Sequence, residues 1–132
     1  MRFFAVLALL AATTAVQAQD RITADQFLDL AVGRTLTFHD FATGEPVGVE
    51  EYLTRRLSVW KEEGGACVYG EITIEEGKLC FLYDHDPDPA CWWTFRDGDR
   101  LFVLYAELYT GEVQEVVKIV DEPLGCPLKP SV

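Results

Sequence analysis

Residues 83–89, Tyr-Asp-His-Asp-Pro-Asp-Pro, hold the densest set of metal-ligand side chains in the chain. Their three aspartates have the alternate spacing that opens a calcium-binding loop, and the histidine adds a nitrogen ligand. A calcium loop also needs glycine at position six and glutamate at position twelve, whereas these positions are Pro89 and Phe95. Because Asp and Pro are common turn residues, the segment is more typical of a rigid acidic turn. A divalent-metal site is therefore the alternative hypothesis, with the candidate ligands Asp84, His85, Asp86 and Asp88.

The chain lacks the side chains of a nucleophilic hydrolase. Its two serines are Ser58 and Ser131, and neither lies in a G-x-S-x-G elbow. Paired carboxylates of the kind used in glycoside cleavage must occur by chance among 22 acidic residues, so they indicate nothing. We expect no catalytic residue, no cofactor and no enzyme activity, and a hydrolase is only the third hypothesis.

The four cysteines are expected to form two disulfides, because an even number in an exported chain is typical of a disulfide framework. The absence of a C-x-x-C pair speaks against structural zinc. Cys80 and Cys91 are expected on adjacent strands, where a link would pin the loop at 83–89, and this pairing leaves Cys67 for Cys126. A direct cross-strand disulfide is geometrically demanding, so Cys67 with Cys91 stays an alternative.

Residues 1–18 have the pattern of a cleaved signal peptide. Arg2 is followed by an apolar run, and Val16 and Ala18 meet the small-residue requirement for cleavage after Ala18. The run is too short for the roughly 20 residues that span a bilayer. We therefore expect a periplasmic or secreted protein with one disulfide-stabilised domain, residues 19–132.

The net charge of −11 excludes some classes of partner. An acidic surface repels nucleic acid and anionic lipid, since binding either requires Lys and Arg to replace counterions. We expect no nucleic-acid partner and no membrane insertion after signal cleavage. The charge is compatible with a basic partner, although it also serves simply to keep an exported domain soluble.

The sequence predicts one helix followed only by strands. Thr23 to Gln26 is a capping box, an apolar face follows, and Gly33 provides the stop. From Arg34 onward, alternating apolar residues and turn signals indicate seven or eight short strands. So many strands in a short chain predict a mostly β fold, an antiparallel meander forming a closed or nearly closed barrel, with the helix over one mouth or flank.

Three expected hairpins define which residues share a face. We place a three-residue loop at 75–77, a two-residue turn at Asp97-Gly98 and another at Thr110-Gly111. These registers predict a common buried face, comprising Ile72, Ile74, Cys80, Leu82, Cys91, Trp93, Phe102, Leu104, Leu108, Val113, Val117 and Ile119.

The opposite face of these strands carries an aromatic patch, formed by Phe81, Tyr83, Trp92, Val103 and Tyr105. If solvated, it is a candidate interaction site, because exposed apolar patches usually mark one. Cover by the helix is the favoured alternative, and cover by the second subunit of a homodimer is another.

The motifs Gly77-Lys78-Leu79-Cys80-Phe81, Cys91 and Asp97-Gly98-Asp99 resemble those of small exported proteobacterial β proteins grouped as domains of unknown function. The resemblance covers about a third of the mature chain and implies a periplasmic β protein, with no activity to carry over. Our main hypothesis is a non-enzymatic binding or interaction module of the cell envelope, whose partner is a protein or a small ligand.

Overall fold

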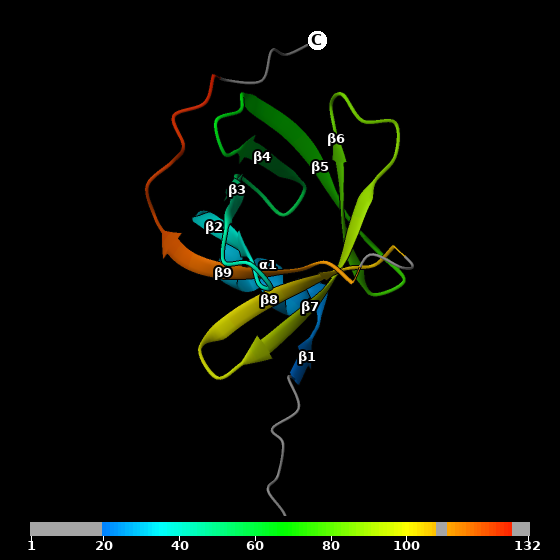
Figure 1. The fold of residues 1–132 in the computed structure, drawn as a ribbon. Helices are drawn as coiled ribbons and strands as arrows, with labels where there is room; N and C mark the ends of the chain where they lie inside the picture. The colour runs from blue at the N-terminus through cyan, green and yellow to red at the C-terminus, as the bar shows by residue number, and fades with distance from the viewer. Residues whose placement is uncertain (1–19, 108–110, 128–132) are drawn as a thin grey trace, which may run out of the picture.

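The computed structural model describes residues 20–107 and 111–127. These residues form nine antiparallel strands and one short helix (Figure 1). The helix is α1 (Ala24–Ala31), and the strands are β1 (Asp20–Ile22), β2 (Thr35–Asp40), β3 (Pro46–Tyr52), β4 (Leu57–Glu62), β5 (Cys67–Glu75), β6 (Lys78–Tyr83), β7 (Ala90–Asp97), β8 (Arg100–Tyr105) and β9 (Val113–Val120).

Strands β2 to β9 form a closed barrel. Each pairs with the next strand along the chain, and β9 returns to pair with β2. The predicted closed antiparallel meander is thus confirmed. Strand β1 was not predicted from the sequence, and it pairs with β7 at Thr94 to Arg96, beyond the residues of β7 that pair with β6.

Helix α1 begins with the predicted capping box. The Thr23 hydroxyl accepts a hydrogen bond from the Gln26 amide at 3.0 Å, and the Gln26 side chain accepts one from the Thr23 amide at 2.9 Å. Gly33 follows the helix with a φ of 81°, which glycine adopts without steric cost. Its amide donates to the Tyr52 carbonyl at 2.8 Å, so the chain leaves the helix directly onto the barrel wall.

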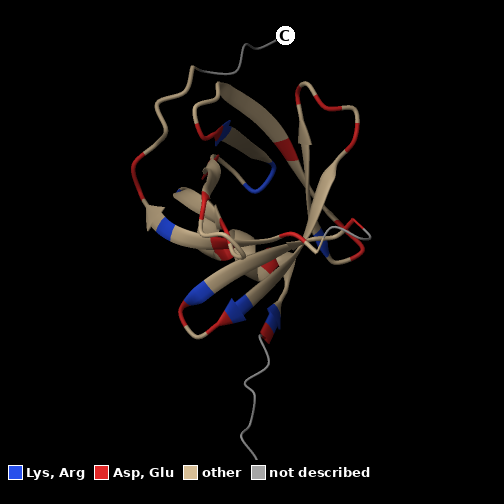
Figure 2. Ribbon diagram, in the orientation of Figure 1, with Lys and Arg blue, Asp and Glu red and all other residues tan. Residues whose placement is uncertain are grey.

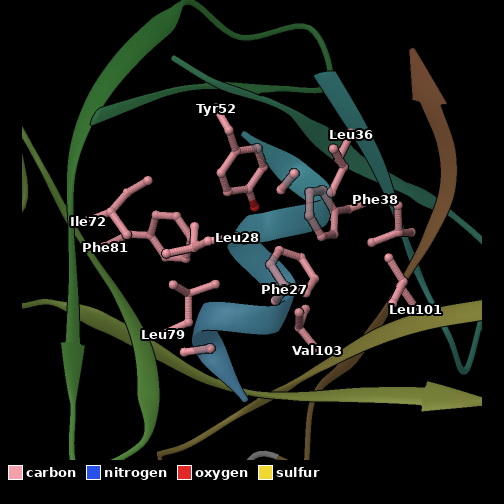
Figure 3. Close-up of a cluster of buried hydrophobic side chains, with 13 residues drawn as sticks. Phe27, Leu28, Leu36, Phe38, Tyr52, Ile72, Leu79, Phe81, Leu101 and Val103 are labelled. Atoms are coloured by element: carbon pink, nitrogen blue, oxygen red, sulfur yellow. The ribbon is translucent and has the colours of Figure 1, made fainter. Parts of the chain in front are cut away.

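The helix closes one end of the barrel. Phe27 and Leu28 are fully buried and point among the inward-facing side chains of the strands (Figure 3). Outside, Arg55 in the β3–β4 turn binds Asp25 and Asp29 of the helix at 2.7 and 2.8 Å. Since successive strands alternate in direction, the β5–β6 and β7–β8 turns also lie at this end. The loops that follow β2, β4, β6 and β8 lie at the other end.

The register of the β5–β6 hairpin differs from the prediction. Glu75 pairs with Lys78, so the turn is the two residues Glu76 and Gly77, with φ of 50° and 80°, instead of a three-residue loop. A turn with two positive φ angles matches the twist of a hairpin and needs no bulge. The one-residue difference turns every side chain of β6 to the opposite face.

The predicted buried face is therefore wrong for most of its members. Ile72 is inside the barrel, but the side chains that do pack with it are Leu79, Phe81, Leu101 and Val103. Leu82, Val117, Ile119 and Ile74 are about two-fifths exposed or more, and Leu108 lies outside the described residues. Six further members alternate with the inward-facing residues and so belong to the outer face: Cys80, Cys91, Trp93, Phe102, Leu104 and Val113. Of these, Cys80 and Phe102 are nevertheless buried, as predicted.

Two large aromatic residues of the outer face are covered locally. The guanidinium of Arg21, on β1, lies 3.7 Å from the ring centre of Trp93. The ring of Phe41, in the β2–β3 turn, packs edge-on against Phe102 at 5.4 Å. These covers explain how apolar residues of β7 and β8 can face outward while the barrel interior is built from the alternate set.

Both disulfides have the pairing that the sequence favoured. Cys80–Cys91 links β6 to β7, and Cys67–Cys126 ties the C-terminal segment to β5. The Tyr69 hydroxyl donates to the Pro127 carbonyl, and the Leu124 amide donates to Glu51 at 3.0 Å. The C-terminal segment is thereby fixed against the outside of β3 to β5.

Two disulfides are typical of proteins that fold in an oxidising compartment. Among the described residues, no helix is both long and apolar enough to cross a bilayer. The expected signal peptide, residues 1–18, lies outside the described residues.

Candidate ligand-binding cavity

The barrel holds a cavity of about 350 Å³ that opens at the end opposite helix α1. Val47, Glu62, Ala90 and Glu112 form its rim, at the strand ends that adjoin the open-end loops. Its wall is mostly aromatic, with side chains from six of the eight barrel strands: Phe38, Tyr52, Trp60, Phe81, Tyr83, Trp92 and Tyr105. Natural ligand sites are concave and mainly apolar, with a few polar groups placed inside, and this cavity has that form.

The wall rings occur in contacting pairs. Trp92 and Tyr105 lie 4.9 Å apart between ring centres, on the paired strands β7 and β8. Phe81 and Tyr83 stack with almost parallel planes at 5.9 Å. Because a packed ring has few alternative rotamers, these pairs give the cavity a defined shape before any ligand enters.

Two inward-facing glycines make room for the rings. A Cβ atom on Gly70 would lie 2.8 Å from the Tyr83 ring, and one on Gly48 would lie 2.5 Å from the Trp60 ring. Real Cβ contacts do not occur at such distances, so any other residue would push these rings away. Gly48 and Gly70 thus allow Trp60 and Tyr83 to lie flat across the neighbouring strands.

A buried carboxyl group lies in the wall of the cavity. Glu50, on β3, is 2 % exposed, and the Tyr83 hydroxyl donates to its two oxygens at 2.9 and 3.2 Å. Burial raises the pKa of Glu50 to about 8, although the hydrogen bond from Tyr83 opposes the rise. The Ser58 hydroxyl also favours the ionised form, but it makes no hydrogen bond of normal geometry. Glu50 is therefore mainly protonated at neutral pH.

The two phenols near Glu50 stay protonated, and that of Tyr83 donates to the Glu50 carboxyl group. Burial raises the pKa of Tyr83 and of Tyr52 well above the ordinary value, so both hydroxyl groups keep their protons at physiological pH. An uncharged Tyr83 can stabilise Glu50 in either protonation state. The Glu50–Tyr83 pair is thus a polar group in a mainly aromatic wall.

The mouth of the cavity is acidic. Burial raises the pKa of Tyr105, and the negative charges of Glu107, Glu112, Asp86 and Asp88 raise it further. Acidic positions mark the β6–β7 loop in Figure 2, whereas Lys and Arg are prominent on β1 and the β7–β8 hairpin at the other end. Gln114 fixes one rim carboxylate by donating to Glu112 at 3.0 Å. A negative potential therefore surrounds the entrance.

The candidate metal ligands Asp84, His85, Asp86 and Asp88 form an exposed loop beside this mouth. The loop is shaped by its own hydrogen bonds, with the Asp86 side chain accepting from the Asp88 amide at 3.1 Å. In the described part of the chain, the one set of three potential ligands close enough to share a metal is Glu75, Cys80 and Cys91. Two of these are joined in a disulfide, so the loop gains no geometric support as a metal site.

The aromatic patch predicted from the sequence is brought together, but inside the barrel. Phe81, Tyr83, Trp92, Val103 and Tyr105 all line the cavity, so their predicted place on the outer face is wrong. The physical reason is the two-residue β5–β6 turn, which turns the side chains of β6 to the opposite face of the sheet. Their grouping on one face follows from strand alternation and is correct.

Sequence reasoning missed the residues on β2 to β4 that complete the cavity. Phe38, Glu50 and Trp60 come from strands whose pairing registers the turn signals do not define. One signal was present: of the two acidic residues between Gly48 and Tyr52, Glu50 alternates in step with Tyr52, so it points inward if Tyr52 does.

No family model matches the chain, and no curated protein or solved structure is similar to it. The function must be argued from the cavity itself.

Proposed function

We propose that this protein is an exported binding protein that holds one small, largely apolar molecule in the open end of its barrel. The observation that carries the proposal is the aromatic-lined cavity of about 350 Å³ with the Glu50–Tyr83 pair in its wall. An eight-stranded barrel is just wide enough either to fill with side chains or to hold one small ligand. Here the helix end is filled and the other end is hollow.

The size of the cavity limits the ligand. An apolar protein cavity of about 150 Å³ accommodates benzene, so this cavity has room for a molecule roughly twice that size. A fused ring system or a ring with a short chain fits this volume, and a long lipid does not. The proposal therefore favours a small ligand over the protein partner that the sequence also allowed.

A binding role without catalysis agrees with the residues around the cavity. Ser58, on β4, is fully buried, and no histidine or lysine lines the cavity to act as a base. The disulfides favour an oxidising compartment, and together with the expected signal peptide they support the periplasm or the cell exterior as the site of action.

A survey of small molecules by thermal shift and calorimetry tests the proposal. Ligands that bind only the native state raise its melting temperature as their concentration exceeds the dissociation constant. Ala90→Trp places a large side chain at the cavity rim, and Ala42→Trp adds the same bulk in the exposed β2–β3 turn. We expect ligands that stabilise the wild type and Ala42→Trp and that fail to bind Ala90→Trp.

Two results would contradict the proposal. One is a wild-type protein that binds no member of a broad survey of small aromatic and aliphatic molecules. The other is an Ala90→Trp variant that folds and binds every hit with unchanged affinity, because the cavity would then not be the binding site.

A further inference from the structure

The carboxyl groups that line the cavity have no basic counterpart there. Glu50 lies in its wall, Glu62 and Glu112 lie at its rim, and no Lys, Arg or His lines it. A second hollow of about 450 Å³ adjoins the mouth, shares Trp60 and Glu62 with the first, and adds Asp86 and His85. An anionic ligand inside the first cavity would face carboxyl groups, and no Lys, Arg or His there would compensate its lost hydration.

Glu50 is a buried acid that faces no cation of the protein. The hydrogen bonds that its carboxyl group accepts in the described structure come from one uncharged phenol, that of Tyr83. Burying an acid without a basic partner costs stability, and a positively charged ligand would provide that partner. A positive charge on the ligand would explain why Glu50 is buried without a basic partner in the protein.

The surroundings of Glu50 also suit a cation. Trp60 stands directly across from Glu50 on the paired strand β4, on the same face of the sheet. Tyr83 contacts its carboxyl group, and the Trp92–Tyr105 pair lines the same cavity. Aromatic faces attract ammonium groups, most strongly where water is excluded, and cages of such rings recognise quaternary ammonium ligands.

We propose that the ligand is a small organic cation, an amine or quaternary ammonium compound with an apolar group, whose charge pairs with the Glu50 carboxylate. This inference rests on the proposed function and names the ligand class for the same cavity. The apolar group packs on the aromatic wall, while the acids of the mouth raise the local concentration of cations. Ligand entry ionises Glu50 and releases its proton to solvent.

Three compounds, each with a phenyl ring on a three-carbon chain, separate charge from shape. Phenylpropylamine is a cation at neutral pH, phenylpropanol is neutral, and phenylpropanoate is an anion. We expect calorimetry at pH 7 to give phenylpropylamine an affinity at least tenfold above that of the alcohol, with no measurable binding of the carboxylate.

Two matched variants locate the charge. Glu50→Gln keeps the shape of the side chain but cannot ionise, and Glu71→Gln removes an exposed acid from the outer face of β5. We expect Glu50→Gln to weaken phenylpropylamine binding at least tenfold and to leave phenylpropanol unchanged. Glu71→Gln should bind all three compounds as the wild type does.

The possible failures are distinguishable. If the alcohol or the carboxylate binds as tightly as the amine, or if Glu50→Gln binds the amine normally, the cation inference is overturned and the cavity remains a binding site. If none of the three compounds binds, the inference is also overturned, and the survey with Ala90→Trp then decides separately whether the cavity binds any small molecule.

Discussion

The Tyr83 hydroxyl on β6 donates a 2.9 Å hydrogen bond to the carboxyl group of Glu50 on β3, inside the barrel and past the two intervening strands. This contact joins strands that are not neighbours in the sheet, so it reports directly on how the barrel interior is packed. It also places a carboxyl group with a raised pKa beside an aromatic-lined cavity.

Glu50 should make the protein less stable as the pH rises. Its pKa is about 8 in the folded state against 4.5 for an exposed glutamate. Below pH 4.5 both states hold the proton, between pH 4.5 and 8 only the unfolded state releases it, and above pH 8 the full cost is present. We expect Glu50→Gln to match the wild type near pH 4 and to be more stable above pH 8, by an amount on the order of 5 kcal/mol at most.

Urea unfolding of both proteins across this pH range gives the difference directly. Comparing the two proteins cancels the contributions of other carboxylates, such as Glu115, whose pKa is lowered by its hydrogen bond with Arg100. A difference in unfolding free energy that stays constant from pH 4 to 9 would show that Glu50 has an ordinary pKa.

Tyr83→Phe should cost more stability when Glu50 is ionised than when it is protonated. A hydrogen bond to a charged group contributes about 1.5–3 kcal/mol, and one between neutral groups about 0.5–1.5 kcal/mol. The variant should also raise the pKa of Glu50 further, because it removes a donor that favours the carboxylate. Denaturant titrations at pH 4 and pH 9 measure both effects, and an equal loss at the two pH values would contradict the contact.

Gly70→Ala should destabilise the protein by about 1–3 kcal/mol through overpacking against the Tyr83 ring. Its cost should fall in a Tyr83→Ala background, where the ring is absent. A double-mutant cycle by chemical denaturation measures this coupling. Additive effects of the two substitutions would mean that the ring does not lie over Gly70.

The two disulfides should contribute unequally. Cys67–Cys126 closes a chain segment with a sequence separation of 59, and Cys80–Cys91 one of 11. The chain-entropy relation gives about 4 kcal/mol for the longer loop and about 3 kcal/mol for the shorter one. Paired Cys→Ser variants, compared by urea unfolding with the wild type under oxidising conditions, should show this order, and equal stability of all three proteins would refute it.

The sequence alone was enough to predict the fold, but not which side chains face the barrel interior. The capping box at Thr23 and the strand and turn signals after Gly33 are local, so the helix and the closed meander could be predicted. Which face of the sheet a side chain occupies depends on the exact turn residues. Glu76 adopts a positive φ that a glutamate rarely takes. That local exception reversed β6 and moved the aromatic patch from the outer face to the cavity.

The candidate site was harder to predict because it is assembled across the barrel. Glu50 and Tyr83 are 33 residues apart, and no spacing rule links them. The loop with metal-ligand spacing, by contrast, stands out in the sequence but does not bring three ligand atoms together. Local motifs therefore drew attention to a loop beside the mouth, while the closed topology placed the acid among the rings.

Fluorescence of a Trp93→Phe variant is the most direct measurement of the central claim, that the barrel interior is a ligand site. The chain has three tryptophans, and the two that remain, Trp60 and Trp92, both line the cavity. Titration with phenylpropylamine should change their emission saturably, and adding Ala90→Trp to the variant should abolish calorimetric binding. An emission spectrum that no small molecule alters in a saturable way would contradict the claim.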